Sequence, residues 1–124
     1  MRLTRTPKQW FVAALIMLPL PAMAEIPVIE KAIAQQNGTG WTFSVTLRHP
    51  DSGWDHYADG WEVLDENGNS LGFRKLVHPH ENEQPFTRSL SGVQIPEGSK
   101  KVFIRAHCLV DGWGEPVYEI DLTD

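Results

Sequence analysis

The sequence predicts an all-β fold, an immunoglobulin- or fibronectin-III-like antiparallel sandwich that follows an N-terminal signal peptide. Two observations carry this prediction. Short segments alternate apolar and polar residues, as half-buried strands do. Turn-forming residues separate these segments at intervals of about 8 to 12 residues, which is typical of a sandwich. An open Greek-key barrel is the alternative arrangement.

Residues 1–24 read as a secretory signal peptide. Three basic residues precede a short apolar run, and Ala22-Met23-Ala24 forms a small-x-small cleavage site. The apolar run is too short to span a bilayer, and no cysteine follows it for a lipid anchor. We therefore expect one domain, residues 25–124, in the periplasm or secreted, with no membrane insertion after cleavage.

The expected strands follow in order along the domain. A weak strand near residues 27–35, which also resembles a helical turn, precedes a glycine-containing loop. Residues 41–48 then alternate clearly, and this period of two predicts one buried face. That face comprises Trp41, Phe43, Val45 and Leu47.

The remaining strands are expected at residues 61–66, 70–78, 85–95, 100–110 and 115–122. Asn67-Gly68 marks a hairpin turn after the first of these, and Trp61 is expected in the core. In the next strand the apolar residues Leu71 and Phe73 are expected to face the core. Their neighbours of opposite parity, Arg74, Leu76 and His78, are then expected to face outward.

The net charge of the expected domain narrows the range of its expected partners. Three of the 11 Lys and Arg residues and none of the 16 Asp and Glu residues lie in residues 1–24, which leaves a net charge of −8 on residues 25–124. An acidic domain repels phosphate backbones and anionic lipid surfaces, so nucleic acid is not expected as a partner and cations are favoured.

The single cysteine, Cys108, excludes an intramolecular disulfide. It shares parity with Val102, Ile104 and Ala106, so we expect an inert, buried thiol. His107 has the opposite parity and cannot pair with it as a catalytic base. If the strand end twists, Cys108 can instead join the histidines as a soft copper ligand. No nucleophile elbow or phosphate-binding loop is visible, so a hydrolase is the least supported function.

All five histidines are expected at one end of the sandwich, because the strand order places the loops that carry them together. His78 and His80 flank Pro79, which favours an extended segment with both imidazoles at one edge. Imidazoles bind zinc and copper well, and nearby acids can orient them. The predicted metal ligands are His78, His80 and His107, with His56 as the fourth. The alternative is that these are polar loop residues or capping groups.

Aromatic loops supply a second hypothesis, a protein-interaction domain that contacts an envelope partner without metal or catalysis. Trp54, Tyr57 and Trp113 lie in expected loops, where they either fold back as an apolar plug or form a binding surface. Arg105 is expected to pair with Glu62 or Glu119.

The segments "GWDHYADGWEV", "LVHPHENEQPFTRSLSGV" and "VFIRAH" resemble a family of small, uncharacterised bacterial exported proteins. The resemblance extends over residues 45–122. It implies an envelope location and a small domain that stands alone. It implies no catalytic residue and no metal ligand.

Overall fold

The computed structural model describes residues 25–115 and 117–122, which form strands and loops without a helix. Within that part of the chain, no helix has the length and apolarity that a membrane crossing needs. The strands are β1 (Val28–Asn37), β2 (Gly40–Arg48), β3 (Ala58–Leu64), β4 (Ser70–Lys75), β5 (Phe86–Val93), β6 (Lys101–Cys108), β7 (Gly112–Trp113) and β8 (Tyr118–Asp121). The prediction of an all-β fold is confirmed.

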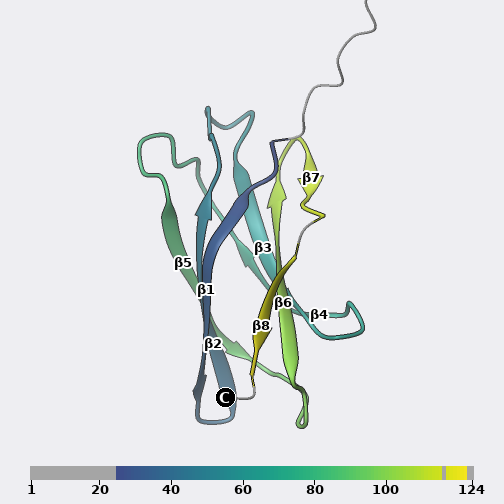
Figure 1. Cartoon of the computed structure of the whole chain (residues 1–124). Helices are drawn as coiled ribbons and strands as arrows, with labels where there is room; N and C mark the ends of the chain where they lie inside the picture. The colour runs from purple at the N-terminus through teal and green to yellow at the C-terminus, as the bar shows by residue number, and fades with distance from the viewer. Residues whose placement is uncertain (1–24, 116, 123–124) are drawn as a thin grey trace, which may run out of the picture.

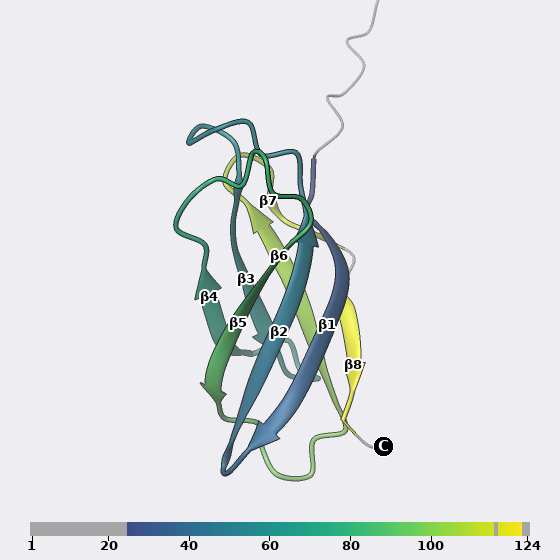
Figure 2. The ribbon, with the colours of Figure 1, turned by 90° about the vertical axis from the view of Figure 1, so that its left-hand side faces the viewer.

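The strands form two antiparallel sheets that face each other (Figures 1 and 2). One sheet has the order β1-β2-β5. The other has the order β4-β3-β6-β7, and β8 also pairs with β6. Strands β7 and β8 pair with different ends of β6: β7 with His107 and Cys108, and β8 with residues 101–104.

The core lies between the sheets and follows the alternation of the strands. Phe43, Val45 and Leu47 of β2 are buried, as are four alternate residues of β6 and Trp61 of β3. On β2 and β6 the residues of opposite parity are more exposed, because successive side chains of a strand point to opposite faces. The predictions for β6 and Trp61 are confirmed, and so is that for β2, except that Trp41 is only partly buried.

The expected orientations of Phe73 and Leu76 are wrong, whereas Leu71 packs partly buried against the core as expected. Phe73 is 48% exposed, whereas Leu76 is 2% exposed. In the pairing with β3, Phe73 lies opposite Glu62 and Arg74 lies opposite the buried Trp61. The inward position next to Arg74 is Gly72, where an added Cβ would lie 3.0 Å from a methyl carbon of Leu90. A small residue at this position lets β5 pack closely. A prediction that places only apolar side chains inward does not detect such a glycine.

Three loops and the start of the described chain meet at one end of the molecule, the upper end in Figure 1. They are the β2–β3, β4–β5 and β6–β7 connections. His49, His56, His78 and His80 lie in the first two of these loops, and His107 lies at the end of β6. The expected gathering of the histidines at one end follows from this topology.

A matched pair of phenylalanine variants tests the core. We expect Phe43→Ala to lower the free energy of unfolding by about 3–5 kcal/mol, because it empties a fully buried site. Phe73→Ala should lower it by about 1 kcal/mol or less, because that ring is half exposed. Denaturant unfolding measures both values. Equal losses in the two variants would contradict this description of the core.

Candidate metal centre

Asp51 is the acceptor that joins the two histidine-bearing loops. Its side chain has no exposed surface. Oδ1 accepts from His49 Nδ1 (2.6 Å) and from the backbone N–H of Ala58 (2.9 Å), and Oδ2 accepts from the backbone N–H of His80 (2.8 Å). One buried carboxylate thus fixes the end of β2, the start of β3 and the β4–β5 loop. Three donors compensate for the cost of burying its charge.

His49 is buried and held by both ring nitrogens. Nδ1 donates to Asp51, since a carboxylate only accepts. Nε2 lies 2.7 Å from the backbone carbonyl oxygen of Glu25. A carboxylate that fixes Nδ1 sets the direction of Nε2, as around many metal-ligating imidazoles. Here Nε2 already contacts the Glu25 carbonyl, so a metal ion at Nε2 would have to displace Glu25.

His56 stands edge-on to His49, with the ring centroids 5.0 Å apart and the planes at 90°. A tight turn places it there: the backbone N–H of His56 donates to the carbonyl of Gly53 (3.1 Å). Gly53 has φ = +144°, a conformation that residues with a Cβ rarely adopt. His56 Nε2 is buried and has no hydrogen-bond partner among the described residues. The same holds for His80 Nδ1 and for one nitrogen each of Trp61 and Arg74, and Asp111 Oδ2 lies 3.5 Å from His56 Nε2.

Cys108 completes the group from the opposite sheet. It ends β6, faces inward and is fully buried. Burial raises the pKa of its thiol, because the thiolate loses solvation there. The prediction of a buried cysteine is confirmed.

His49, His56 and Cys108 form one group of candidate ligands. One ligand atom from each residue lies within 4.8 Å of those of the other two. Two imidazoles and a thiol offer the nitrogen and sulfur donors that zinc and copper take in proteins.

Asp111, in the β6–β7 loop, brings a carboxylate to the same place. Its Oδ2 lies 3.5 Å from His56 Nε2 and 3.7 Å from Cys108 Sγ. Two atoms bound at about 2.0–2.3 Å to one tetrahedral metal ion lie roughly 3.3–3.8 Å apart. These separations therefore match those of ligands that share an ion.

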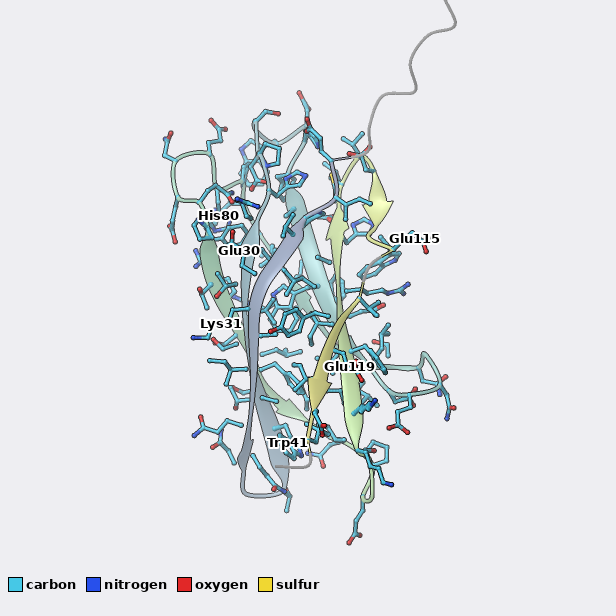
Figure 3. All side chains as sticks on the ribbon, in the orientation of Figure 1. Glu30, Lys31, Trp41, His80, Glu115 and Glu119 are labelled. Carbon is cyan, nitrogen blue, oxygen red and sulfur yellow. The ribbon has the colours of Figure 1, made fainter. Side chains whose placement is uncertain are left out.

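The structure brings His78 and His80 together but gives them different environments. Their ring centroids are 4.4 Å apart. His78 is exposed, whereas His80 is 4% exposed and stacks on Phe86 with 3.8 Å between centroids. Figure 3 labels His80 at the same end of the molecule, close to the start of β5.

His80 already has partners for much of its polar surface. Its Nε2 accepts from Arg88 Nη2 (2.9 Å), since a guanidinium only donates. Its carbonyl accepts from the side chain of Gln84 (2.8 Å). Burial lowers the pKa of His80, and the nearby charges of Arg88 and His78 lower it further. A metal ion at Nε2 would have to displace Arg88.

His107 lies on the outer face of the five-stranded sheet, apart from the buried thiol. Its Nδ1 contacts Asp59 Oδ1 (2.5 Å), and its ring packs edge-on against Trp113 at 4.8 Å between centroids. Arg105 lies over the Trp113 ring at 4.1 Å and donates to Glu62. Glu62 is one of the two partners that were expected for Arg105. Trp113 thus packs on the sheet face, while Trp54 is 65% exposed.

Sequence reasoning selected His56 from the buried group, named Cys108 as an alternative ligand, and did not select His49. A signal for His49 was present, because it continues the parity of Phe43, Val45 and Leu47. Cys108 in turn continues the parity of Val102, Ile104 and Ala106. Strands β2 and β6 end at the same end of the molecule on facing sheets, so extending both alternations would have placed the two side chains together.

Comparisons with known proteins give relatives but no assigned activity. No family model matches the sequence. The chain is 38% identical over 99 residues to a putative lipoprotein of Halomicrobium mukohataei. The matched segment covers 80% of this chain and 48% of that protein. The chain therefore spans about half the length of this relative.

Two solved structures are similar to this chain at low sequence identity. The hypothetical protein PH1083 from Pyrococcus horikoshii OT3 superposes with a TM-score of 0.51 at 14% identity, over 81% of this chain and 90% of that chain. A superoxide reductase in the oxidized state has a TM-score of 0.48 at 16% identity, over 83% and 91% of the two chains. At this identity the first likeness shows the fold alone.

Removing the Asp51 carboxylate should be costly. We expect Asp51→Ala to lower the free energy of unfolding by about 3 kcal/mol or more, because it leaves three buried donors without an acceptor. The control is Asp55→Ala, an exposed acid in the same loop, which should change it by about 0.5 kcal/mol or less. A loss in Asp51→Ala no larger than that in the control would contradict the role given to Asp51.

His80 should make stability depend on pH. The unfolded residue titrates near about pH 6.5 and the folded one lower, so the unfolded state binds more protons between these values. The contribution of neutral His80 is therefore full above about pH 6.5 and is lost as the pH falls toward the folded pKa. We expect His80→Gln to flatten the stability profile below pH 6.5, measured by denaturant unfolding. His78→Gln should flatten it less, because it removes only one of the charges that lower the pKa of His80. Parallel profiles for wild type and His80→Gln would contradict this.

Proposed function

We propose that this domain binds a transition-metal ion, copper or zinc, through His49, His56 and Cys108. The proposal rests on one observation: a ligand atom from each of two imidazoles and a thiol lies within 4.8 Å of the other two, at the end of the core between the two sheets. The unpartnered Nε2 of His56 supports it, since buried polar atoms ordinarily have a partner.

Each residue has a distinct role in the proposed site. His49 binds through Nε2, because Asp51 fixes its Nδ1–H. His56 binds through Nε2, the nitrogen that faces Asp111. Cys108 binds as the thiolate, and the ion replaces the proton that burial otherwise retains. Asp111 is the carboxylate nearest to both His56 and Cys108, and it supplies an oxygen ligand.

The four histidines predicted from the sequence remain a second candidate ligand set for the same function. The pair His78 and His80 lines an open groove of about 490 Å³ together with Trp54, Glu81 and Glu83. The short distance between their rings favours this pair. The contacts of His80 with Arg88 and of His107 with Asp59 each engage one ring nitrogen. His80 Nδ1, like His56 Nε2, is buried and has no hydrogen-bond partner among the described residues.

A protein-interaction surface is the alternative function. Apolar side chains are exposed on all three loops at this end: Trp54 (65%), Val77 (64%) and Val110 (63%). Apolar side chains that are exposed together at one end occur at contact surfaces. A partner that meets these loops would lie directly beside the candidate metal centre.

An envelope location fits the same proposal. The relative from Halomicrobium mukohataei is described as a putative lipoprotein, and residues 1–24 of this chain have the pattern of a secretory signal. We also assign the sandwich to the immunoglobulin or fibronectin-III class. The orders β1-β2-β5 and β4-β3-β6 support this, because they correspond to the A-B-E and C′-C-F neighbours of that class.

Metal titration separates the two ligand sets. We expect the exported chain to bind one equivalent of Zn(II) or Cu(II). Cys108→Ser and His56→Gln should each weaken binding at least about tenfold, as loss of ligand support does. Co(II) should give a near-ultraviolet thiolate-to-cobalt absorption that Cys108→Ser abolishes.

The matched control is His78→Ala, an exposed histidine outside the buried group, which should bind as wild type does. The thermal unfolding of each metal-free variant verifies that it is folded. Loss of binding in His78→Ala together with retention in Cys108→Ser would reject the buried group and favour the histidines predicted from the sequence.

A further inference from the structure

We propose that the groove beside His78 and His80 binds a basic, extended segment of a partner protein, with a lysine or arginine side chain held by Trp54 and Glu81. The inference rests on the contact surface given above as the alternative function, and it does not depend on the metal centre. It adds the chemistry of the partner, which exposed apolar side chains alone do not define.

The groove is formed by two loops at the end of the molecule where the histidines gather. Trp54 of the β2–β3 loop and residues 78–83 of the β4–β5 loop line it, and its volume is about 490 Å³. Pockets of this size hold ligands much larger than one ammonium ion. An indole, two carboxylates and an amide share this surface, so it fits a ligand that has both a cationic and an apolar part.

A hydrogen-bonded turn fixes Trp54 in an exposed position. Gly53 pairs with His56, whose N–H donates to the Gly53 carbonyl (3.1 Å), so Trp54 lies in a closed turn. The rings of Trp54 and Tyr57 pack edge to face, with 5.8 Å between centroids. The indole nevertheless remains 65% exposed. An indole that is held but uncovered offers its π face to a cation, and tryptophan is the strongest aromatic partner for one.

The loops at this end carry a one-sided charge. Residues 49–57, 76–85 and 109–111 contain five Asp or Glu residues and neither Lys nor Arg. Asp55 and Glu81 are exposed, and neither forms an ion pair within the described part of the chain. Complementary charge steers a partner to its site and fixes its orientation there, so this surface favours a basic partner.

Glu81 reaches from one loop to the turn that carries Trp54. Its Oε1 lies 3.5 Å from the position that a Cβ would take on Gly53. Glu83 differs, because Arg88 Nη1 lies 3.7 Å from its Oε1 and already compensates part of its charge. Glu81 is therefore the carboxylate that we expect to pair with a cation bound at Trp54.

The wall of the groove also contains a donor without an acceptor. His80 lines the groove with a side chain that is 3% exposed. Its Nε2 accepts from Arg88, so the neutral ring carries its hydrogen on Nδ1. Nδ1 has no hydrogen-bond partner among the described residues, and Asp51 Oδ2, at 3.9 Å, is too far to accept. A peptide segment can supply an acceptor, because each of its residues brings a backbone carbonyl, which a simple amine lacks.

The experiment titrates the exported chain, kept metal-free with a chelator, with a blocked hexapeptide of alternating lysine and valine. Backbone amide NMR shifts locate the binding and give its Kd. The matched probe is the same peptide with acetylated lysines, which removes the charge. The variants are Trp54→Ala and Glu81→Gln, and the control is Glu97→Gln, an exposed acid in the turn between β5 and β6. Cys108→Ser is included because it removes the thiol of the candidate metal centre. Thermal unfolding verifies that every variant is folded.

We expect the lysine peptide to bind with amide shifts confined to residues 52–57 and 76–83, and more weakly as salt is added. Acetylation of the peptide and Trp54→Ala should each weaken binding about threefold or more. Glu81→Gln should weaken it about twofold or more. Glu97→Gln and Cys108→Ser should bind as wild type does.

Equal binding of the acetylated peptide would overturn the inference, as would an unchanged affinity in Trp54→Ala, shifts centred elsewhere, or no binding of the lysine peptide. None of these results bears on the metal centre, which Zn(II) titration tests separately. A chain that binds the peptide but no metal would overturn the metal proposal and leave this inference in place.

Discussion

The buried carboxylate of Asp51 is the constraint on which this end of the molecule depends. A charge without solvent contact is stable only when donors surround it, and here the donors come from three separate segments: His49, Ala58 and His80. Meeting that requirement fixes the loop between β2 and β3, anchors the β4–β5 loop, and sets the direction of the His49 ring. The position of the candidate centre therefore depends on the hydrogen bonds of this buried carboxylate, which hold the loops in place.

The two sheets divide the work of building the centre. His49 follows the last residue of β2 in one sheet and Cys108 ends β6 in the other, so their approach depends on the packing of the core between them. The β2–β3 loop adds His56, and Glu25, before β1, contacts His49 and Asp111. Because β6 holds Cys108 and the hydrogen bonds of Asp51 hold His49, little conformational entropy remains to be lost when an ion binds. The surrounding loops also expose apolar side chains, which offer a contact surface for a partner protein beside the candidate centre.

Alternation along the strands was enough to predict the all-β fold, the buried faces of β2 and β6, and the core position of Trp61. It failed at β4, where Gly72 occupies the inward position for reasons of close packing that no hydrophobicity pattern records. The gathering of the histidines at one end follows from the order of the strands. The alternation pattern along the chain supports that order. The choice among them required contacts between segments distant in sequence: His80 is engaged by Arg88 and His107 by Asp59, whereas Cys108 and His49 meet across the core.

The central claim is that a metal ion lies between His49, His56 and Cys108. The most direct measurement is a crystal structure of the exported chain grown with Zn(II), with diffraction data collected on both sides of the zinc absorption edge. The account predicts one anomalous peak about 2.0–2.1 Å from Nε2 of each histidine and about 2.3 Å from Cys108 Sγ. A peak at His78 and His80 with none at Cys108, or no peak in a well-ordered crystal, would contradict it.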